Sequence, residues 1–552
     1  MRWLNENSKK FLENWYLLPW QTVEGRVKDI ADTFEKYIPN KGMKGKFYDY
    51  MSKGWFSLSS PVWSNYWTDR GLPISCFTSY IEDDMASILY TGGEVWMMSK
   101  YWGGTAAFFW DLRPRGAEIR NNWQSSWAVH AMKIFDSIVD NTSQGSVRRG
   151  SFAAYYPIEG EDIEEFLEIA WEGNPIQRIQ TWVTVTDKFI EEMKAWDKEK
   201  RKVWAKVIQS RSERGFPYIF FTDTVNNNTV DCYKDNWHKI HSSNLCSEIA
   251  LPTSKDWSFV CCLSSMNLSY YDEWKDTDAV EVMVYFLDSV MQEFIDKLEK
   301  LKSTNANAFY LMERAYNFAK ENRALGLGTL GYHTYLQKNN IPFESPEARE
   351  INKEMHKTLR DKSYRASEEL FSLFGWPELL VPYKRRNATL NAIAPTTSSA
   401  FILGQASQSI EPIWSNCYVK DMAKLKVTFK NPVLVELLKE LGQDNKEVWK
   451  SIRDRDGSVQ HLDFLSAKQK SVFKTFVEIN QYEIIDQAAD RQKFIDQSQS
   501  LNLMVSPETP VKDINKLYLD AWEQGVKTLY YQHSKSAAQE LSRKISCSGC
   551  EA

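Results

Sequence analysis

Two hydrophobic periodicities alternate along this chain of 552 residues, and their alternation constrains the fold more than any other feature. Apolar residues recur at alternating four- and three-residue steps from Val280 to Leu301, which predicts a long amphipathic helix. Residues 179–186 alternate and are rich in β-branched side chains, residues 218–221 form a short apolar run, and residues 390–394 are a third stretch of strand type. Strands interleaved with helices favour an α/β architecture.

Two further segments bear on the architecture. The stretch from about 420 to 475 is charged and lacks strong strand signals, so we predict that it is helical. Residues 326–331 match the pattern GxGxxG, but residues 309–322 before them have a helical pattern, whereas a dinucleotide-binding fold needs a strand there. A nicotinamide dehydrogenase would rest on this motif alone, so we do not interpret it as a cofactor site.

The composition excludes several classes of protein. The net charge is -5, so the chain as a whole is not a nucleic-acid binder, and any substrate phosphate needs a local site. The longest apolar runs are interrupted by charge and the first residues lack a signal-peptide pattern, so we expect a cytoplasmic protein without a membrane span. The 8 cysteines are too few for a secreted disulfide framework, which leaves buried apolar residues, metal ligands or redox catalysts.

The string Asn-Leu-Cys-Ser-Glu at residues 244–248 carries the densest chemistry in the sequence. If this segment is extended, Asn244, Cys246 and Glu248 share one face, and an amide, a thiol and a carboxylate converge. An isolated cysteine of this kind is more often a buried structural residue beside a surface glutamate. The neighbouring residues through Thr253 change that balance.

This longer string resembles the active-site finger loop of ribonucleotide reductases. The resemblance implies that Cys246 carries a thiyl radical that abstracts the ribose 3′-hydrogen, and that Glu248 is the general base on the 3′-hydroxyl. Asn244 would hold the departing 2′-hydroxyl by hydrogen bonds. Leu245 and Ser247 fall within the same substrate-binding loop.

Removal of a 2′-hydroxyl as water needs two reducing equivalents, which two thiols supply when they close to a disulfide. Cys76, in the string at residues 73–77, and Cys261, in the string at residues 261–268, resemble the family's reductant cysteines. The spacing Cys-x-Leu-Ser-x-x-Asn-Leu selects Cys261 and leaves Cys262 as a bystander.

Cys547 and Cys550 form a CxxC pair close to the end of the chain. A lone CxxC usually suggests half a zinc site, but no second Cys/His pair at zinc-finger spacing exists in the sequence, so we expect no metal in this chain. A terminal dithiol instead suits a shuttle that reduces Cys76 and Cys261 and is itself reduced by thioredoxin or glutaredoxin. A general thiol-disulfide oxidoreductase would explain this pair but would leave residues 244–248 unexplained.

Hydroxyl-rich residues follow the strand predicted at 390–394 and precede an apolar run of helical type. Hydroxyls and free N–H groups at a helix start make an anion site, although a plain helix cap is an equal alternative. The longer string at residues 386–412 resembles the family and implies that the substrate diphosphate binds there. The substrate positions expected outside the finger loop are Ser60, Ser75, Pro395, Thr396, Thr397, Ser398 and Ser399.

Tyr530 and Tyr531 are adjacent, and two adjacent tyrosines are normally packing residues. In class I ribonucleotide reductases the string at residues 525–532 carries a stacked tyrosine pair that relays the radical from a second subunit. The resemblance therefore implies a small (beta) subunit with a metal cofactor, dinuclear iron or manganese, and no cofactor bound covalently to this chain. The alternative is an adenosylcobalamin-dependent (class II) enzyme, which forms its radical in place and needs no relay.

Several charged residues fall where the family binds a nucleoside triphosphate that sets substrate specificity. Gln144 and Arg148 lie in the stretch that corresponds to the loop reading the substrate base. The sequence departs from the family at residues 121–123, where we expected more glycine. The positions expected at the effector site are Asp83, Asp84, Met85, Arg113 and Arg120.

The resemblance extends from residue 60 to residue 531 and includes the tail. It implies a ten-stranded α/β barrel of two five-stranded halves with the finger loop inside, in a protein that forms a homodimer. We expect residues 1–59 to be a helical segment too short for the family's ATP-cone domain, residues 60–532 to be the barrel with helical insertions, and residues 533–552 to be a flexible tail. A non-catalytic interaction protein would explain none of these features.

Overall fold

The structure is a computed structural model that describes residues 1–39, 42–101, 103–119, 124–125, 128–144, 148–169, 171–422 and 425–534. For residues 143–144, 148–149, 420–422 and 425–427 it describes the backbone alone. None of the helices in these ranges is long and apolar enough to cross a membrane.

Five parallel strands form the first half of a barrel, as expected from strand-type runs separated by helices. The runs predicted at 179–186 and 218–221 are the two strands furthest along this half, so both predictions are confirmed. The strands are β2 (Cys76–Tyr80), β3 (Gly104–Phe108), β6 (Phe152–Pro157), β7 (Ile179–Val185) and β8 (Tyr218–Phe221). The helices between them are α5 (Met85–Lys100), α6 (Val129–Asn141), α7 (Ile163–Leu167), α8 (Asp187–Lys194) and α9 (Lys198–Arg214).

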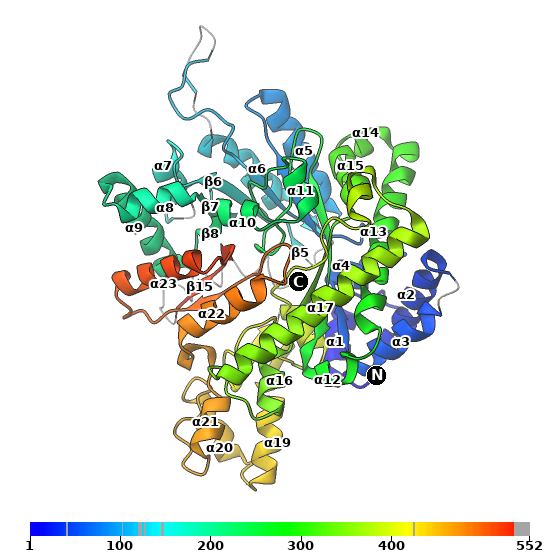
Figure 1. Cartoon of the computed structure of the whole chain (residues 1–552), viewed down its shortest axis with the longest axis vertical. Coiled ribbons are helices and arrows are strands. Elements are labelled where there is room, and N and C mark those ends of the chain that lie inside the picture. Colours follow the sequence, from blue (N-terminus) through cyan, green and yellow to red (C-terminus); the bar gives the residue numbers. More distant parts are fainter. Residues whose placement is uncertain are drawn as a thin grey trace.

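The second half begins with β9 (Phe259–Asn267) and β10 (Leu325–Leu330), which are parallel to each other. Bridges then join Leu327 to Asn391 and Ile393 to Gln499. The closing pairs are β13 (Leu503–Met504) with β15 (Gln532–His533), β14 (Thr528–Leu529) with β8, and β9 with β2. Ten backbone segments therefore close into two halves of five, which is the predicted barrel (Figure 1).

Long helices cover the second half. The predicted helix is α13 (Ala279–Thr304), and it packs against α17 (Pro346–Phe374), which crosses the front of the molecule in Figure 1. Near the start of the chain, α1 (Glu6–Trp15), α2 (Val23–Tyr37) and α3 (Met43–Lys53) precede β1 (Phe56–Leu58), which pairs with β9. The other barrel-associated helices are α4 (Ser60–Asn65), α10 (Thr222–Asn227), α11 (Asp231–Asp235), α12 (Tyr271–Trp274), α14 (Ala306–Tyr310), α15 (Glu313–Asn322), α16 (Tyr332–Lys338), α18 (Thr397–Ile402), α22 (Gln481–Gln492) and α23 (Val511–Glu523).

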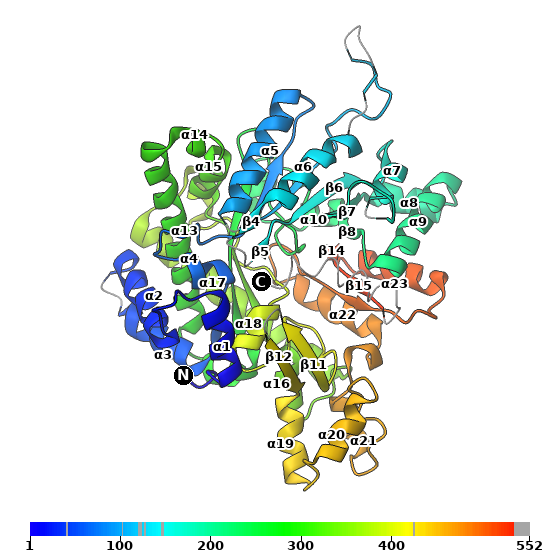
Figure 2. The same cartoon turned by 180° about the vertical axis from the view of Figure 1, so that it is seen from behind.

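The segment predicted to be helical throughout, 420–475, begins instead with a hairpin of β11 (Cys417–Met422) and β12 (Leu425–Lys430). This prediction was wrong at its start because residues 425–430 alternate apolar and polar side chains within a charged stretch. The rest is helical, with α19 (Pro432–Glu440), α20 (Lys446–Arg453) and α21 (Ala467–Val472) around a small core of their own. Figure 2 shows this unit projecting from the barrel, on the side where α18 lies.

The first five residues of the GxGxxG motif lie in β10, and Gly331 follows the strand as the N-cap of α16. A Cβ atom added at Gly328 would lie 2.3 Å from the backbone oxygen of Ala392, so this glycine lets the segment at 391–393 approach the strand. That segment forms two isolated β-bridges, at Asn391 and Ile393, in place of the continuous strand predicted at 390–394.

Candidate active site

The loop that carries Cys246 turns inside the barrel. Ser243 and Ala250 form an antiparallel bridge, and Ser247 between them has a φ of 77°. Residues 244–248 therefore do not adopt the extended conformation considered from the sequence, because a left-handed residue breaks the alternation of side chains. The turn still brings the amide and the carboxylate together, since Asn244 Nδ2 donates to Glu248 Oε1 over 2.9 Å.

Both halves of the barrel hold this loop. From the first half, the Tyr155 hydroxyl donates to the backbone oxygen of Asn244 over 2.7 Å. From the second half, Ser500 Oγ donates to the backbone oxygen of Cys246 over 2.5 Å. The loop is fixed inside the barrel as expected for a finger loop, and its partners come from segments far apart in the sequence.

Glu248 is a buried carboxyl group with two hydrogen-bond donors. Asn244 Nδ2 meets one of its oxygens, and Ser500 Oγ meets the other over 3.0 Å. Burial raises the pKa of Glu248 from 4.5 to about 7, although both hydrogen bonds oppose the shift. A carboxyl group with this pKa can accept or return a proton near neutral pH.

Cys76 and Cys261 are direct cross-strand partners in the antiparallel pair of β2 and β9. Residues so placed have Cα atoms about 4.5–5.5 Å apart, and disulfides span about 4.4–6.8 Å between Cα atoms. Both cysteines are buried and reduced, and burial raises the pKa of the Cys261 thiol well above its ordinary value. Cys262 is the next residue of β9, so its side chain points to the other face of the strand.

Two amides lie beside these thiols. Asn244 Nδ2 lies 3.5 Å from Cys76 Sγ, and Gln497 Nε2 lies 3.6 Å from Cys261 Sγ. Asn244 therefore touches both the dithiol and Glu248. No sequence motif pointed to Gln497 or Ser500, because both residues lie outside the strings described above.

The predicted substrate residues line one cavity of about 150 Å³. Ser247 is the exception, because its hydroxyl points away and donates to the backbone oxygen of Gln499. The predicted residues that line the cavity are Ser60, Ser75, Cys76, Asn244, Leu245, Cys246, Glu248, Pro395, Thr396, Thr397, Ser398 and Ser399. Sequence reasoning missed the other lining residues, which are Ser57, Ser59, Pro61, Gly104, Leu263, Ser264, Ser265 and Ala394.

Two helices begin at this cavity. The first is α4, which starts at Ser60, and the second is α18, which starts at Thr397 after Thr396 in a left-handed conformation with φ 54°. The hydroxyl of Thr396 accepts a hydrogen bond from the Ser409 backbone N–H and is thereby fixed. The first N–H groups of a helix lack partners within it, so the start of α18 presents donors to an anion, whereas the first turn of α4 contains Pro61, which has no N–H.

Tyr530 and Tyr531 lie directly after β14, with ring centroids 4.5 Å apart and planes at 64°. The rings meet edge to face, so the stacking expected for this pair is not observed. Tyr218 packs against both rings, at 4.6 and 4.7 Å. Tyr530 is buried, and Tyr531 is half-buried and stacks on His533.

The expected effector residues are only partly described. Arg113 forms an ion pair of 2.7 Å with Asp83. Asp84 caps α5 by accepting from the backbone N–H groups of Ala86 and Ser87, and the side chain of Met85 next to it is exposed. The predictions for Arg120, for the side chains of Gln144 and Arg148, and for Cys547 and Cys550 fall outside the described residues.

A partly buried cysteine, a buried carboxyl group and a facing pair of thiols lie together inside a ten-stranded α/β barrel, an arrangement that suits a thiol-dependent oxidoreductase. The family model of the ribonucleotide reductase barrel domain matches residues 74–200, 197–378 and 374–532. The chain belongs to the ribonucleotide reductase family, as a large, catalytic subunit.

Individual relatives agree with this assignment. The solved structure of the Actinobacillus ureae class Id ribonucleotide reductase alpha subunit is 50% identical, with a TM-score of 0.91 over 99% of both chains. The large-subunit relative from Frog virus 3 (isolate Goorha) is 37% identical over 90% of this chain and 89% of its own length. The ribonucleoside-diphosphate reductase large subunit of Invertebrate iridescent virus 3 is 34% identical over 89% of this chain and 87% of its own length.

Proposed function

We propose that this chain reduces ribonucleoside diphosphates to 2′-deoxyribonucleoside diphosphates, with Cys246 as the radical-bearing thiol. The observation that carries the proposal is the single cavity in which Cys246, Glu248 and Asn244 meet Cys76, the partner of Cys261 across the strands. Diphosphates are the substrates named for the viral relatives.

Each of these side chains has one role in the proposed reaction. The Cys246 thiyl radical takes the ribose 3′-hydrogen, and Glu248 accepts the proton of the 3′-hydroxyl. The 2′-hydroxyl leaves as water beside the Asn244 amide. Cys76 and Cys261 supply two electrons and two protons as they close to a disulfide, after which Cys246 returns the hydrogen to C3′. The sum is ribonucleotide plus dithiol giving deoxyribonucleotide, water and disulfide.

The substrate diphosphate is assigned to residues 395–399 and Ser60. The start of α18 presents N–H donors beside serine and threonine hydroxyls, which suit phosphate oxygens, and Ser60 lines the same cavity. The nucleoside then extends from there toward Cys246.

The radical is supplied by a small subunit with a dinuclear iron or manganese centre and enters through Tyr531 and Tyr530. Two observations support this: the similarity to a class Id alpha subunit, and the contact between the two phenol rings. The adenosylcobalamin alternative would leave this aromatic pair without a redox role.

The remaining assignments concern turnover and control. Cys547 and Cys550 would reduce the Cys76–Cys261 disulfide and be reduced in turn by thioredoxin or glutaredoxin, which suits a cytoplasmic enzyme. A nucleoside triphosphate would bind a homodimer near Asp83, Asp84, Met85, Arg113 and Arg120, with Gln144 and Arg148 reading the base. In this division, residues 1–59 are a helical lead-in, 60–532 the catalytic barrel and 533–552 the reducing tail.

The experiment measures CDP reduction by the purified chain with and without a metal-loaded small subunit, for the parent and for Cys246→Ser. We expect activity only for the parent with its partner, and retained CDP binding in the variant, because a serine hydroxyl does not readily form the corresponding radical. Deoxynucleotide formation by Cys246→Ser would refute the assignment, and activity with adenosylcobalamin and no partner would favour the alternative.

A further inference from the structure

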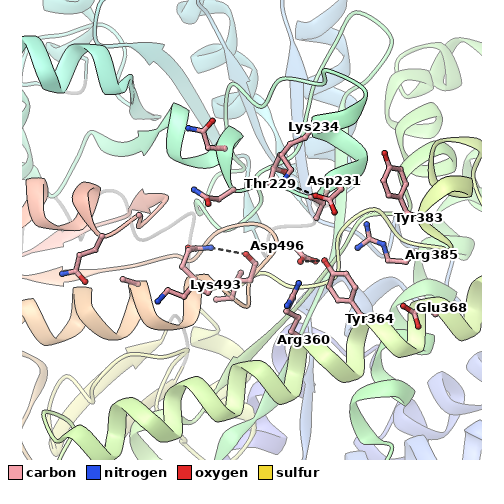
Figure 3. A pocket seen from close by; sticks show the side chains of 18 residues that line it. Thr229, Asp231, Lys234, Arg360, Tyr364, Glu368, Tyr383, Arg385, Lys493 and Asp496 are labelled. Atoms are coloured by element: carbon pink, nitrogen blue, oxygen red, sulfur yellow. Dashed lines mark hydrogen bonds and ion pairs between the residues drawn. The ribbon is translucent and has the colours of Figure 1, made fainter.

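A second, larger cavity of about 620 Å³ lies between α11, α17 and α22 (Figure 3). It shares no lining residue with the substrate cavity. In this cavity, Arg385 lies before the barrel segment at 391–393, and Asp496 lies before the segment at 499–504. In the substrate cavity, residues 395–399 lie after the segment at 391–393. These segments are parallel, so the two cavities open at opposite ends of the barrel.

The charged residues of this cavity are unequally matched. The cations are Lys234, Arg360, Arg385 and Lys493, and the carboxylates are Asp231, Glu368 and Asp496. Lys234 pairs with Asp231 over 3.1 Å. Within the described part of the chain, none of the other three cations forms an ion pair.

Asp496 is already satisfied by neutral donors. Its carboxylate accepts from the Tyr364 hydroxyl over 2.7 Å and from the backbone N–H groups of Leu390 and Asn391 over 2.7 and 3.3 Å. These donors are neutral, so Asp496 keeps its charge, and Asp496 and Glu368 together leave two carboxylates against the three remaining cations. The cavity therefore attracts an anion.

Arg385 makes the imbalance costly, because only 7% of this residue is exposed. Its guanidinium carbon lies 4.8 Å from the centroid of the Tyr364 ring, and that of Arg360 lies 5.2 Å from the same centroid. In Figure 3 both arginines point into the cavity beside Tyr364. Asp496 offsets part of the Arg385 charge, and an anion bound between the two arginines would offset the positive charge that remains in the cavity.

A further positive charge lies behind the wall. Lys527 is buried, and its ammonium group donates to the backbone oxygens of Asn228, Asp496 and Gln497, all over 2.7–2.8 Å. These partners are neutral carbonyl groups and burial lowers the pKa of Lys527 to about 7, so an anion bound in the cavity would favour the charged form of this lysine.

We propose that this cavity binds a phosphate-bearing small molecule, with Arg385 and Arg360 as its principal ligands. The planar guanidinium group matches the oxygens of a phosphate in a bidentate manner. The volume of about 620 Å³ accommodates a nucleotide-sized ligand, and Tyr364 and Tyr383 provide aromatic surface for a base. The shared chemistry is the phosphate group, carried by a nucleotide or free in solution.

The test is isothermal titration of the full chain with pyrophosphate, for the parent, Arg360→Gln, Arg385→Gln and Arg455→Gln. Arg455 is an exposed arginine outside the cavity and serves as the matched control. The substrate cavity also takes a diphosphate under the proposed function, so two classes of site are expected. Only one class of site should depend on Arg360. Arg360→Gln should reduce the affinity of that class for pyrophosphate about tenfold or more, because a charge-assisted hydrogen bond is lost.

Arg385→Gln alters a buried residue, so thermal unfolding is measured alongside, and the exposed Arg360→Gln decides the result if the other variant does not fold. Parallel titrations with AMP and inorganic phosphate identify the source. Tighter, Arg360-dependent binding of AMP indicates a nucleotide, and equal binding indicates free phosphate. Pyrophosphate affinity unchanged in folded Arg360→Gln, or no second class of site in the parent, would overturn the proposal. CDP binding in the same variants is independent of it and tests the proposed function separately.

Discussion

Cys76 on β2 and Cys261 on β9 face each other directly across two antiparallel strands, although 184 positions of sequence separate them. Strand register alone sets this relationship. It places two thiols within disulfide reach, and Cys76 lines the cavity that also contains Cys246.

Cys76→Ser should abolish CDP reduction even in a single turnover, because one thiol cannot supply two electrons. Cys262→Ser is the matched control, since this buried neighbour on β9 points to the other face and should keep near-normal turnover. The measurement is product per active site after rapid mixing with the small subunit. Full single-turnover yield in Cys76→Ser would contradict the assignment of the dithiol.

The tail should matter only for repeated turnover. Cys547→Ser combined with Cys550→Ser should still form product once per reduced Cys76–Cys261 pair and then stall with thioredoxin as the reductant. Multiple-turnover assays with thioredoxin and with dithiothreitol separate the two phases. Normal cycling of the double variant with thioredoxin would show that the tail is not the shuttle.

Glu248 should set a pH limit, because burial raises its pKa to about 7 and the carboxylate is the form that accepts a proton. We expect kcat/KM for CDP to fall about tenfold per pH unit well below pH 7, as the base becomes protonated. Glu248→Gln should lose activity, because glutamine cannot accept the proton, and its residual rate should not show this fall below pH 7.

The same shift predicts the sign of the stability effect. A carboxyl group whose pKa is raised by folding stabilises the fold below its ordinary pKa, and this contribution is lost as pH rises through about 7. Folded Glu248→Gln should therefore be at least as stable as the parent at pH 8. A marked loss of stability there would mean that inactivity reflects unfolding.

Tyr530→Phe and Tyr531→Phe should each eliminate turnover with the small subunit while leaving the fold and CDP affinity intact. Phenylalanine keeps the packing, with a stability cost of about 1 kcal/mol if a hydrogen bond is lost, but it has no phenol to oxidise. Tyr332→Phe is the control, because this fully buried hydroxyl bonds Ala348 and Gln487 far from the pair in sequence. Substantial activity in both Tyr530 and Tyr531 variants would favour packing over relay.

Gly328→Ala should destabilise the barrel by about 1–3 kcal/mol, the usual cost of overpacking. The added Cβ atom would lie 2.3 Å from the backbone oxygen of Ala392, where the chain has little room to move. Gly45→Ala is the control, because nothing lies within 4 Å of that site inside α3, and helix propensity predicts a gain of about 0.5–1 kcal/mol. Urea unfolding of both variants measures the difference, and equal stabilities would show that the close approach is not required.

Local patterns predicted much of the fold. The helix from Val280, two strands of the first half and the α/β class follow from periodicity, which depends on neighbours a few positions apart. The prediction failed at 425–430, because the strand-type alternation there lies within a charged stretch. It also failed at 390–394, where the structure has isolated β-bridges in place of a continuous strand.

The sequence by itself determined the candidate chemical groups, because Asn244, Cys246, Glu248 and the two proposed reductant cysteines are chemically distinctive and occur in recognisable strings. Only the tertiary structure decided how they meet. The facing of Cys76 and Cys261 depends on long-range register, and the pKa of Glu248 depends on exclusion of water by the whole barrel. The arginine-lined cavity at the other end brings together residues 229–234, 360–385 and 492–496, which no local pattern could connect. Sequence fixes chemical identity residue by residue, whereas distance, burial and electrostatic balance arise only when remote segments pack together.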